Sequence, residues 1–180
     1  DRSMASRLGA YGVNLVQNPQ GIVYNPLSVL ESLARVQSGE PYDIPDLVQG
    51  KDAYFSLNHH GRFSRSTPEE ALEVMNRSLA EAHALWQQCN AVILTFGTAW
   101  AYKLRSTGEV VANCHKQDSS YFERQLLEPF ELFTKIAPMM DALVTERPDM
   151  QIIVTVSPVR HMRDNFRDNT ISKARLHNLT

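Results

Sequence analysis

Two uninterrupted apolar runs stand out in the pattern of hydrophobic and polar positions along the chain. They are AVILTF at 91–96 and QIIVTV at 151–156, and polar or turn-forming residues bound both. A run of this length is typical of a strand covered on both faces, as the strands of a parallel sheet are. We therefore expect these two segments to be core strands of one parallel sheet.

Other segments carry apolar residues at steps of three and four, which indicates helices with one buried face. Asn25 followed by Pro26 opens one of them, and Gly39 closes it. Thr67-Pro68-Glu69-Glu70 opens another with a capping box and acidic residues in the first turn. The expected helices run from Met4 to Tyr11, from Pro26 to Gly39, from Thr67 to Trp86 and over roughly 129–146, where Pro138 perturbs the last.

Shorter strands are predicted between these elements. VNLVQ at 13–17 and AYFSL at 53–57 are strand candidates, and 99–104 with 109–112 predicts a hairpin. Helices alternating with buried strands follow the βαβ order of a doubly wound sheet. We expect an α/β fold in one domain over residues 1–180.

Composition excludes several classes of function. The 180 residues are 43% hydrophobic and 21% charged, with a formal net charge of −2. No basic cluster predicts binding to nucleic acid or to an anionic membrane, and no apolar stretch reaches the ~20 residues of a membrane span. Cys89 and Cys114 form no CxxC pair, so we expect no metal, no cofactor and two reduced thiols, as in a cytoplasmic protein.

Both ends of the chain have the character of internal sequence. The first residue is Asp1 rather than Met, and helix-like sequence stands at the start and at the end, SKARLHNLT. We therefore expect a fragment of a longer domain, incomplete at both ends.

Candidate chemistry gathers where the predicted strands end, because ligands of open α/β sheets bind beyond the carboxyl ends of the strands. The polar, turn-forming or ionisable residues at these places are Gly21 and Asn25, then Gly97, Thr98 and Trp100, then Asn113, His115 and Lys116, and finally Ser157, Arg160 and His161. No GxSxG elbow, HExxH motif, P-loop or dinucleotide fingerprint is present.

Each candidate also has an explanation without chemistry. Gly21 and Gly97 equally fit positions that need a special backbone angle or close packing. His115 and His161 equally fit loop histidines, one bonded to a carbonyl and one solvated. Thr98 and Ser157 are residues that often cap a turn, and Trp100 is a typical core residue.

Four blocks of this sequence, in the same order, resemble the GSCFA family. They are NPQGIVYNPLSV at 18–29, LTFGTAWAY at 94–102, VANCHK at 111–116, and TVSPVRH at 155–161 followed by SKARL at 172–176. NHHGRFS at 58–64 resembles a further stretch, with Gly61 where the family usually has serine. The resemblance spans most of the chain.

The resemblance implies a fold and a mechanism. GSCFA proteins are regarded as relatives of SGNH hydrolases, which are three-layer α/β/α sandwiches with a mostly parallel, flavodoxin-like sheet. Their nucleophile would be the serine of the Gly-Ser-Cys-Phe-Ala motif, expected before Asp1, and a later Asp-x-x-His segment is expected beyond Thr180. Neither lies in this chain.

The resemblance also assigns roles by position. Gly21 takes the place of an oxyanion N–H donor. Residues 97–100 take the place of Gly-x-Asn-Asp without its Asn, so Asn113 or His115 becomes the substitute donor. Residues 158–161 have the spacing of Asp-x-x-His without the Asp, which makes His161 a residue that lines the site.

The leading hypothesis is an ester hydrolase that acts on an acylated small molecule or glycan through a serine ester. Acyl transfer to an alcohol on the same scaffold is the alternative within the enzyme class. A ligand-binding module that has lost catalysis is the alternative from another class.

Overall fold

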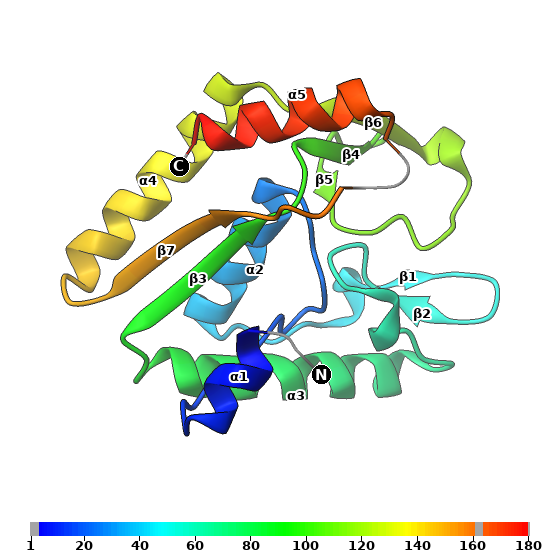
Figure 1. The fold of residues 1–180 in the computed structure, drawn as a ribbon. Coiled ribbons are helices and arrows are strands. Elements are labelled where there is room, and N and C mark those ends of the chain that lie inside the picture. The colour runs from blue at the N-terminus through cyan, green and yellow to red at the C-terminus, as the bar shows by residue number, and fades with distance from the viewer. Residues whose placement is uncertain (1–3, 161–163, 180) are drawn as a thin grey trace.

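A computed structural model describes residues 4–160 and 164–179, which form an α/β fold (Figure 1). The helices are α1 (Met4–Ala10), α2 (Pro26–Ser38), α3 (Pro68–Trp86), α4 (Pro129–Glu146) and α5 (Phe166–His177). The strands are β1 (Val48–Gln49), β2 (Tyr54–Phe55), β3 (Ala91–Phe96), β4 (Trp100–Leu104), β5 (Val110–Val111), β6 (Phe122–Leu126) and β7 (Gln151–Val156). No helix of the described part is long and apolar enough to cross a membrane.

The two apolar runs form a parallel pair, as their sequence predicts. β3 and β7 lie in register from Ala91 opposite Gln151 to Phe96 opposite Val156. The expected hairpin is also present, because β4 pairs antiparallel with β5.

The α/β class is confirmed, but in the described residues the parallel part of the fold is the β3–β7 pair, and it stands beside antiparallel sheets. β6, which the sequence did not predict, pairs antiparallel with β4 and makes a second sheet in the order β5-β4-β6. β1 and β2 form a separate small ladder. The reason is topological, because each short connection here joins antiparallel neighbours, whereas β3 reaches β7 through the long crossover that parallel strands need.

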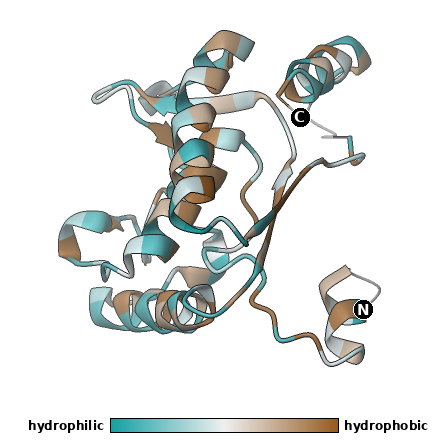
Figure 2. Cartoon of the chain, turned by 90° about the vertical axis from the view of Figure 1, so that its left-hand side faces the viewer, coloured by the Kyte–Doolittle hydropathy of each residue, from teal (hydrophilic) through white to brown (hydrophobic). Residues whose placement is uncertain are grey.

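The main core lies on one side of the β3–β7 pair. α2, α3 and α4 cover that side, while α1 and α5 lie on the other (Figure 2). The core side chains come from these helices, from both sheets and from α5, and include Leu33, Met75, Phe96, Leu132 and Leu176.

The outer face of the parallel pair is only partly covered. Ile93 is 38% exposed and Ile153 45% exposed. Two residues further along the same strands, the hydroxyls of Thr95 and Thr155 form a hydrogen bond of 2.9 Å across the pair. Coverage on both faces, expected from the unbroken apolar pattern, is therefore wrong at these positions. An apolar run alone does not reveal whether a second layer reaches every residue.

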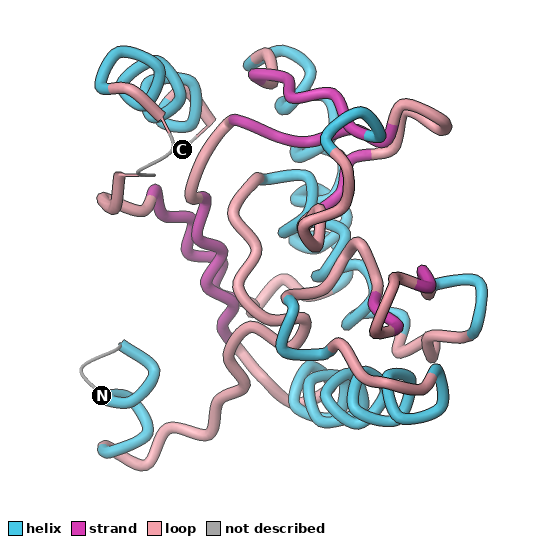
Figure 3. Tube along the Cα trace, turned by 90° about the vertical axis from the view of Figure 1, so that its right-hand side faces the viewer, coloured by secondary structure: helices cyan, strands magenta, loops and turns pink. Residues whose placement is uncertain are grey.

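Residues 13–17 do not form the predicted strand. They are an extended loop after α1 (Figure 3) without a ladder partner in the described residues, and Val13 and Val16 are exposed. A strand needs a neighbouring strand to pair with, and within residues 4–160 and 164–179 no strand pairs with this segment. A groove of about 670 Å³ separates it from β3, with side chains of α2 and α3 also in its lining.

The predicted N-caps at Asn25 and Thr67 and the predicted end of α2 at Gly39 are confirmed. The Asn25 side chain accepts a hydrogen bond from the Ser28 N–H at 2.9 Å, and Gly39 ends α2 in the left-handed conformation, at φ 66°. Thr67 accepts from the Glu70 N–H at 3.3 Å. These local signals were readable because they involve residues three or four apart.

Leu143 and Val144 of α4 offer a matched test of this core. Leu143 is 1% exposed and Val144 55% exposed. Leu143→Ala is expected to lower the free energy of unfolding by about 2–5 kcal/mol, because it leaves a cavity. Val144→Ala is expected to change it by less than about 0.5 kcal/mol. Urea unfolding followed by circular dichroism measures both, and equal effects would contradict the packing of α4 described here.

Candidate functional site

The loop that follows β3 is tied to the segment before α2. The N–H groups of Gly97 and Thr98 both donate to the Tyr24 carbonyl, at 2.7 and 3.2 Å. A Cβ atom on Gly97 would lie only 3.1 Å from the Tyr24 ring. Gly97 thus permits this close approach of Tyr24 without crowding, and its N–H is not free to bind an oxyanion in this arrangement.

Ser172 of α5 holds the rest of this loop. Its buried hydroxyl bonds to the Thr98 hydroxyl at 3.0 Å and accepts from the Ala99 N–H at 2.8 Å. Thr98 also accepts from the Trp100 N–H at 3.1 Å. The hydroxyl of Thr98 therefore shapes the turn from β3 into β4.

Lys173 joins the ends of the two parallel strands. Its ammonium donates to the carbonyls of Gly97 and Ser157, the latter at 2.6 Å. Burial lowers the pKa of this amine from its usual value. Lys173 is not among the residues predicted from the sequence, although it stands in the SKARL block, because a lysine in a helix usually faces solvent.

A small pocket brings together three of the predicted site residues, Asn25, Thr98 and Trp100. Its volume is about 130 Å³. Asn25 Nδ2 donates to the Ser28 hydroxyl at 2.9 Å while Oδ1 caps α2, so the amide retains one further N–H. The pocket lies just beyond the carboxyl end of β3, where the sheet rule placed a site.

Two charged residues that were not predicted from the sequence, Arg124 and Asp164, line the same pocket. Arg124 of β6 forms an ion pair with Asp164, which precedes α5. The guanidinium carbon of Arg124 also lies 3.9 Å from the centre of the Trp100 ring. β6 had not been predicted, so no sequence signal brought Arg124 to the site.

The segment 56–60 contacts two more of the predicted residues, His115 and Gly21. His115 Nε2 lies 2.8 Å from the Ser56 carbonyl and 3.0 Å from that of His59, so this nitrogen carries the proton. The His115 ring stacks on Phe55 at 4.3 Å. Burial lowers the pKa of His115, against the opposing effect of the two carbonyls. His115 therefore fastens its loop to this segment.

Gly21 packs against the same segment. Its φ is +85°, and a Cβ there would lie 2.2 Å from the Cβ of His60. The Gly21 N–H donates to the Asn18 carbonyl at 2.7 Å. No larger residue fits here, and the N–H needed for an oxyanion role is engaged in a turn.

His59 is buried at the centre of this region. Its ring lies edge-on to Tyr42, at 4.6 Å, and to Phe63, at 5.1 Å. Neither ring nitrogen has a hydrogen-bond partner among the described residues. Burial lowers the pKa of His59 to about 3, so it stays neutral at physiological pH.

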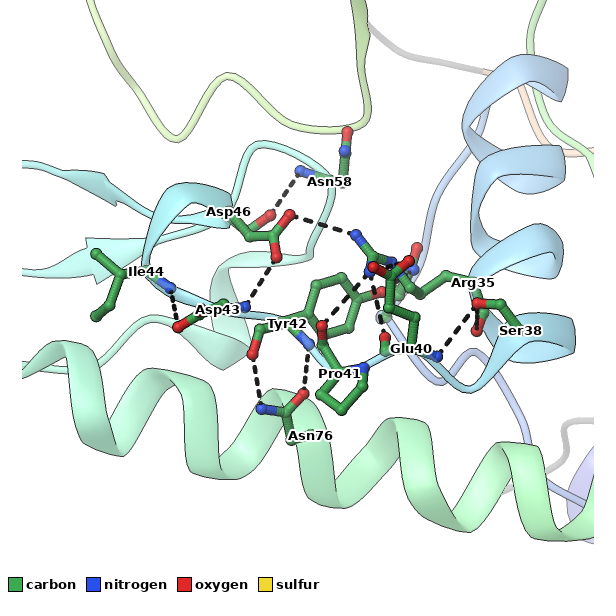
Figure 4. A network of polar contacts seen from close by, with 12 residues as sticks. Arg35, Ser38, Glu40, Pro41, Tyr42, Asp43, Ile44, Asp46, Asn58 and Asn76 are labelled. Atoms are coloured by element: carbon green, nitrogen blue, oxygen red, sulfur yellow. Dashed lines mark hydrogen bonds and ion pairs between the residues drawn. The ribbon is translucent and has the colours of Figure 1, made fainter.

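A polar network fixes the position of Tyr42 (Figure 4). Its N–H donates to Asn76 Oδ1 at 2.7 Å, and Asn76 Nδ2 donates to the Tyr42 carbonyl at 3.0 Å. The Gln20 amide donates to the Tyr42 hydroxyl. The guanidinium of Arg35 lies over the Tyr42 ring, 4.6 Å from its centre, and pairs with Asp46 at 3.3 Å. α2 and α3 thereby hold the loop on which His59 packs.

The remaining predicted residues lie at the loop ends. Asn113 Oδ1 accepts from the His115 N–H at 2.9 Å, and Lys116 is exposed with a positive φ of 58°. The Ser157 N–H donates to the Phe96 carbonyl at 2.8 Å, and Arg160 is exposed. His161 lies outside the described residues. No group of His, Cys, Asp and Glu within the described ranges is arranged to hold a metal ion.

The family model described as "GSCFA family" matches residues 1–180. The chain belongs to the GSCFA family. No curated protein and no solved structure matches it significantly.

The sequence blocks that resemble the GSCFA family contact one another in the structure. Tyr24 of the first block binds Gly97 of the second, and His115 of the third binds the backbone of the NHHGRFS stretch. Lys173 of the last block binds Gly97 as well. The motifs of this GSCFA protein therefore describe one connected region around the end of β3.

The buried His59 predicts a pH dependence of stability. Its pKa is near 3 in the fold and about 6.5 in the unfolded chain. The unfolded state alone binds this proton between those values, so stability is lost as the pH falls below about 6.5. From pH 7 to pH 5 the loss from His59 is about 2 kcal/mol. Urea unfolding midpoints at pH 7 and pH 5 measure this loss. The His59→Leu variant has no titrating ring at this position, so between the two pH values it is expected to lose about 2 kcal/mol less stability than the parent chain. An unchanged slope in His59→Leu would show that His59 is not buried as a neutral ring.

Lys173 offers a second test. Lys173→Met keeps the length of the side chain but leaves the carbonyls of Gly97 and Ser157 without this donor. The free energy of unfolding is expected to fall by about 1–3 kcal/mol. Lys135→Met, at an exposed position of α4, is the control and should change it by less than about 0.5 kcal/mol. Chemical unfolding of both variants settles the comparison.

Proposed function

We propose that this GSCFA protein is an ester hydrolase of the SGNH type, which acts on an acylated small molecule or glycan through a serine ester. The proposal includes a three-layer α/β/α sandwich that a further strand completes beside β3. The observation that carries it is the unpaired edge of β3 next to the groove, with the pocket just past the end of the same strand.

The groove has the form of a strand position. β7 occupies one edge of β3, and in the described residues no strand pairs with the other. The groove follows that edge along Ala91–Thr95 and is bounded across from it by residues 13–18. Strands in a sheet lie about 4.8 Å apart, so an extended segment that enters parallel to β3 would bond to it along its length.

A residue at the end of such a strand would face the pocket. A segment parallel to β3 ends where β3 ends, beside Gly97, and the pocket lined by Asn25, Thr98 and Trp100 lies directly beyond. The family resemblance assigns the serine nucleophile to a strand of this kind. This placement supports attack by the serine on an ester held in the pocket.

The donors in the pocket region limit how an oxyanion could be held. Because the N–H groups of Gly21 and Gly97 already have acceptors, they serve the reaction only if those turns open. Asn25 keeps a second amide N–H at the pocket wall. A donor in this position lowers the barrier by a few kcal/mol when it meets the developing negative charge.

The test is serine-dependent ester cleavage by a chain extended to include the Gly-Ser-Cys-Phe-Ala motif. We expect this chain to cleave 4-nitrophenyl acetate and to react with a fluorophosphonate probe, and its Ser→Ala variant to do neither. Residues 1–180 alone are expected to give no labelling, because the nucleophile is absent. In the extended chain, His161→Ala is expected to lower kcat with no change in the unfolding midpoint.

Three outcomes would overturn the proposal. They are fluorophosphonate labelling of a serine within residues 1–180, cleavage that survives the Ser→Ala change, and no cleavage of short-chain esters by a folded extended chain. The last outcome favours a binding module without catalysis. Circular dichroism of each protein confirms that the comparison is between folded chains.

A further inference from the structure

We propose that Arg124 determines the specificity of the pocket beyond β3 and selects a ligand group that ends in a carboxylate. The pocket as a substrate site rests on the proposed hydrolase function, but the affinity of the pocket for a carboxylate can be measured without turnover. The inference follows from how Arg124 is held and which of its donors remain.

The backbone places Arg124 on the wall of the pocket. It lies opposite Tyr102 in the pairing of β4 with β6, so the two side chains leave the sheet on the same face. Trp100 lies two residues before Tyr102 and shares that face. Trp100, Tyr102 and Arg124 all line the pocket.

Asp164 and Trp100 hold the guanidinium from two sides. The side chain of Asp164 is 2% exposed and that of Arg124 28% exposed, so the carboxylate lies beneath and the arginine faces outward. The Trp100 ring packs against the plane of the guanidinium. These contacts fix the direction of the side chain before any ligand arrives, which reduces the entropy lost on binding.

Within the described residues, most of the N–H donors of Arg124 have no acceptor. A guanidinium has five N–H groups in a planar fork, and Asp164 accepts from Nη2. Within residues 4–160 and 164–179, no other acceptor contacts Arg124. The planar fork matches the two oxygens of a carboxylate, and such a pair binds more strongly than a neutral hydrogen bond.

The surroundings favour a short anionic group. Apart from Arg124 and Asp164, no ionisable group except the phenols of Tyr24 and Tyr102 lines the pocket among the described residues. The ammonium of Lys173 binds the carbonyl of Gly97, the residue that precedes Thr98 of the pocket wall in the sequence. The volume of 130 Å³ holds about four groups of the size of water, which fits a carboxylate with one or two methylenes.

Arg124 could instead serve only to tie β6 to the start of α5. A purely structural role predicts that ligands leave Arg124 unaffected and that its loss changes stability alone. Affinity for a carboxylate, compared with that for a neutral ligand of the same shape, separates the two roles.

The experiment titrates the 180-residue chain with monomethyl succinate, and separately with dimethyl succinate, which has nearly the same shape and no charge. The indole N–H signals of the two tryptophans in a ¹H–¹⁵N spectrum report binding, with Trp100 as the probe and Trp86 as the internal reference. We expect a saturable shift of Trp100 with the monoester and at least tenfold weaker binding of the diester.

The variants remove Arg124 without leaving a buried charge. Arg124→Gln combined with Asp164→Asn is expected to weaken monoester binding at least tenfold, and Arg124→Lys to weaken it less. Arg77→Gln, at an exposed position of α3, removes one positive charge elsewhere and should bind like the parent chain. If the double variant fails to fold, Arg124→Lys and the comparison of the two esters still decide the question.

The proposal is overturned if neither ester shifts Trp100, if both bind equally, or if the folded double variant binds the monoester as tightly as the parent. Its fate is separable from that of the hydrolase. If the 180-residue chain binds the carboxylate but the extended chain cleaves no ester, Arg124 remains a binding residue and the proposed hydrolase function is overturned. If the extended chain cleaves both esters at equal rates and the Arg124 variants do not change those rates, the hydrolase function stands and the role of Arg124 in specificity is overturned.

Discussion

The parallel pairing of β3 with β7 is the constraint on which the rest of this structure depends. It brings Gly97 and Ser157, which are 60 positions apart in the sequence, to the same edge. Lys173 then satisfies both carbonyls at that edge, and α5 is thereby positioned against the loop that leads into β4. Because parallel strands need a crossover, this one pairing also decides where α4 and the second sheet lie.

The site forms at the junction between the two sheets. Trp100 begins β4 immediately after the end of β3, and Arg124 reaches it from β6 across the antiparallel ladder. Parallel strands supply glycine turns and backbone groups here, while the antiparallel sheet supplies aromatic rings and charge. The chemistry proposed for the pocket depends on this combination, since neither sheet carries both kinds of group to the edge.

Support for the site comes from a buried region that carries few charges. His59 is neutral, buried and in edge-on contact with Tyr42 and Phe63, and Tyr42 is held in turn by Asn76 and Arg35. Rigid packing around the segment 56–60 leaves the loop of His115 and the turn at Gly21 in one arrangement. The edge of β3 away from β7 has a different character, because it pairs with no strand among the described residues and borders the groove; a sheet edge of this kind can accept another strand.

The sequence by itself determined the elements that depend on neighbours in the chain. Caps at Asn25 and Thr67, the helix over 129–146 and both apolar strands were predicted, because residues three or four apart and unbroken apolar runs are local signals. The family was also legible from four ordered blocks. Only the tertiary structure decided that 13–17 pairs with no strand of the described part, that β6 exists, and that the N–H groups of the candidate glycines are already bound. The pairing of β3 with β7, the ion pair of Arg124 with Asp164, and the two hydrogen bonds of Lys173 join residues 16 to 76 positions apart. Contacts over such separations leave no periodic pattern in the sequence, and so the three-dimensional arrangement alone reveals them.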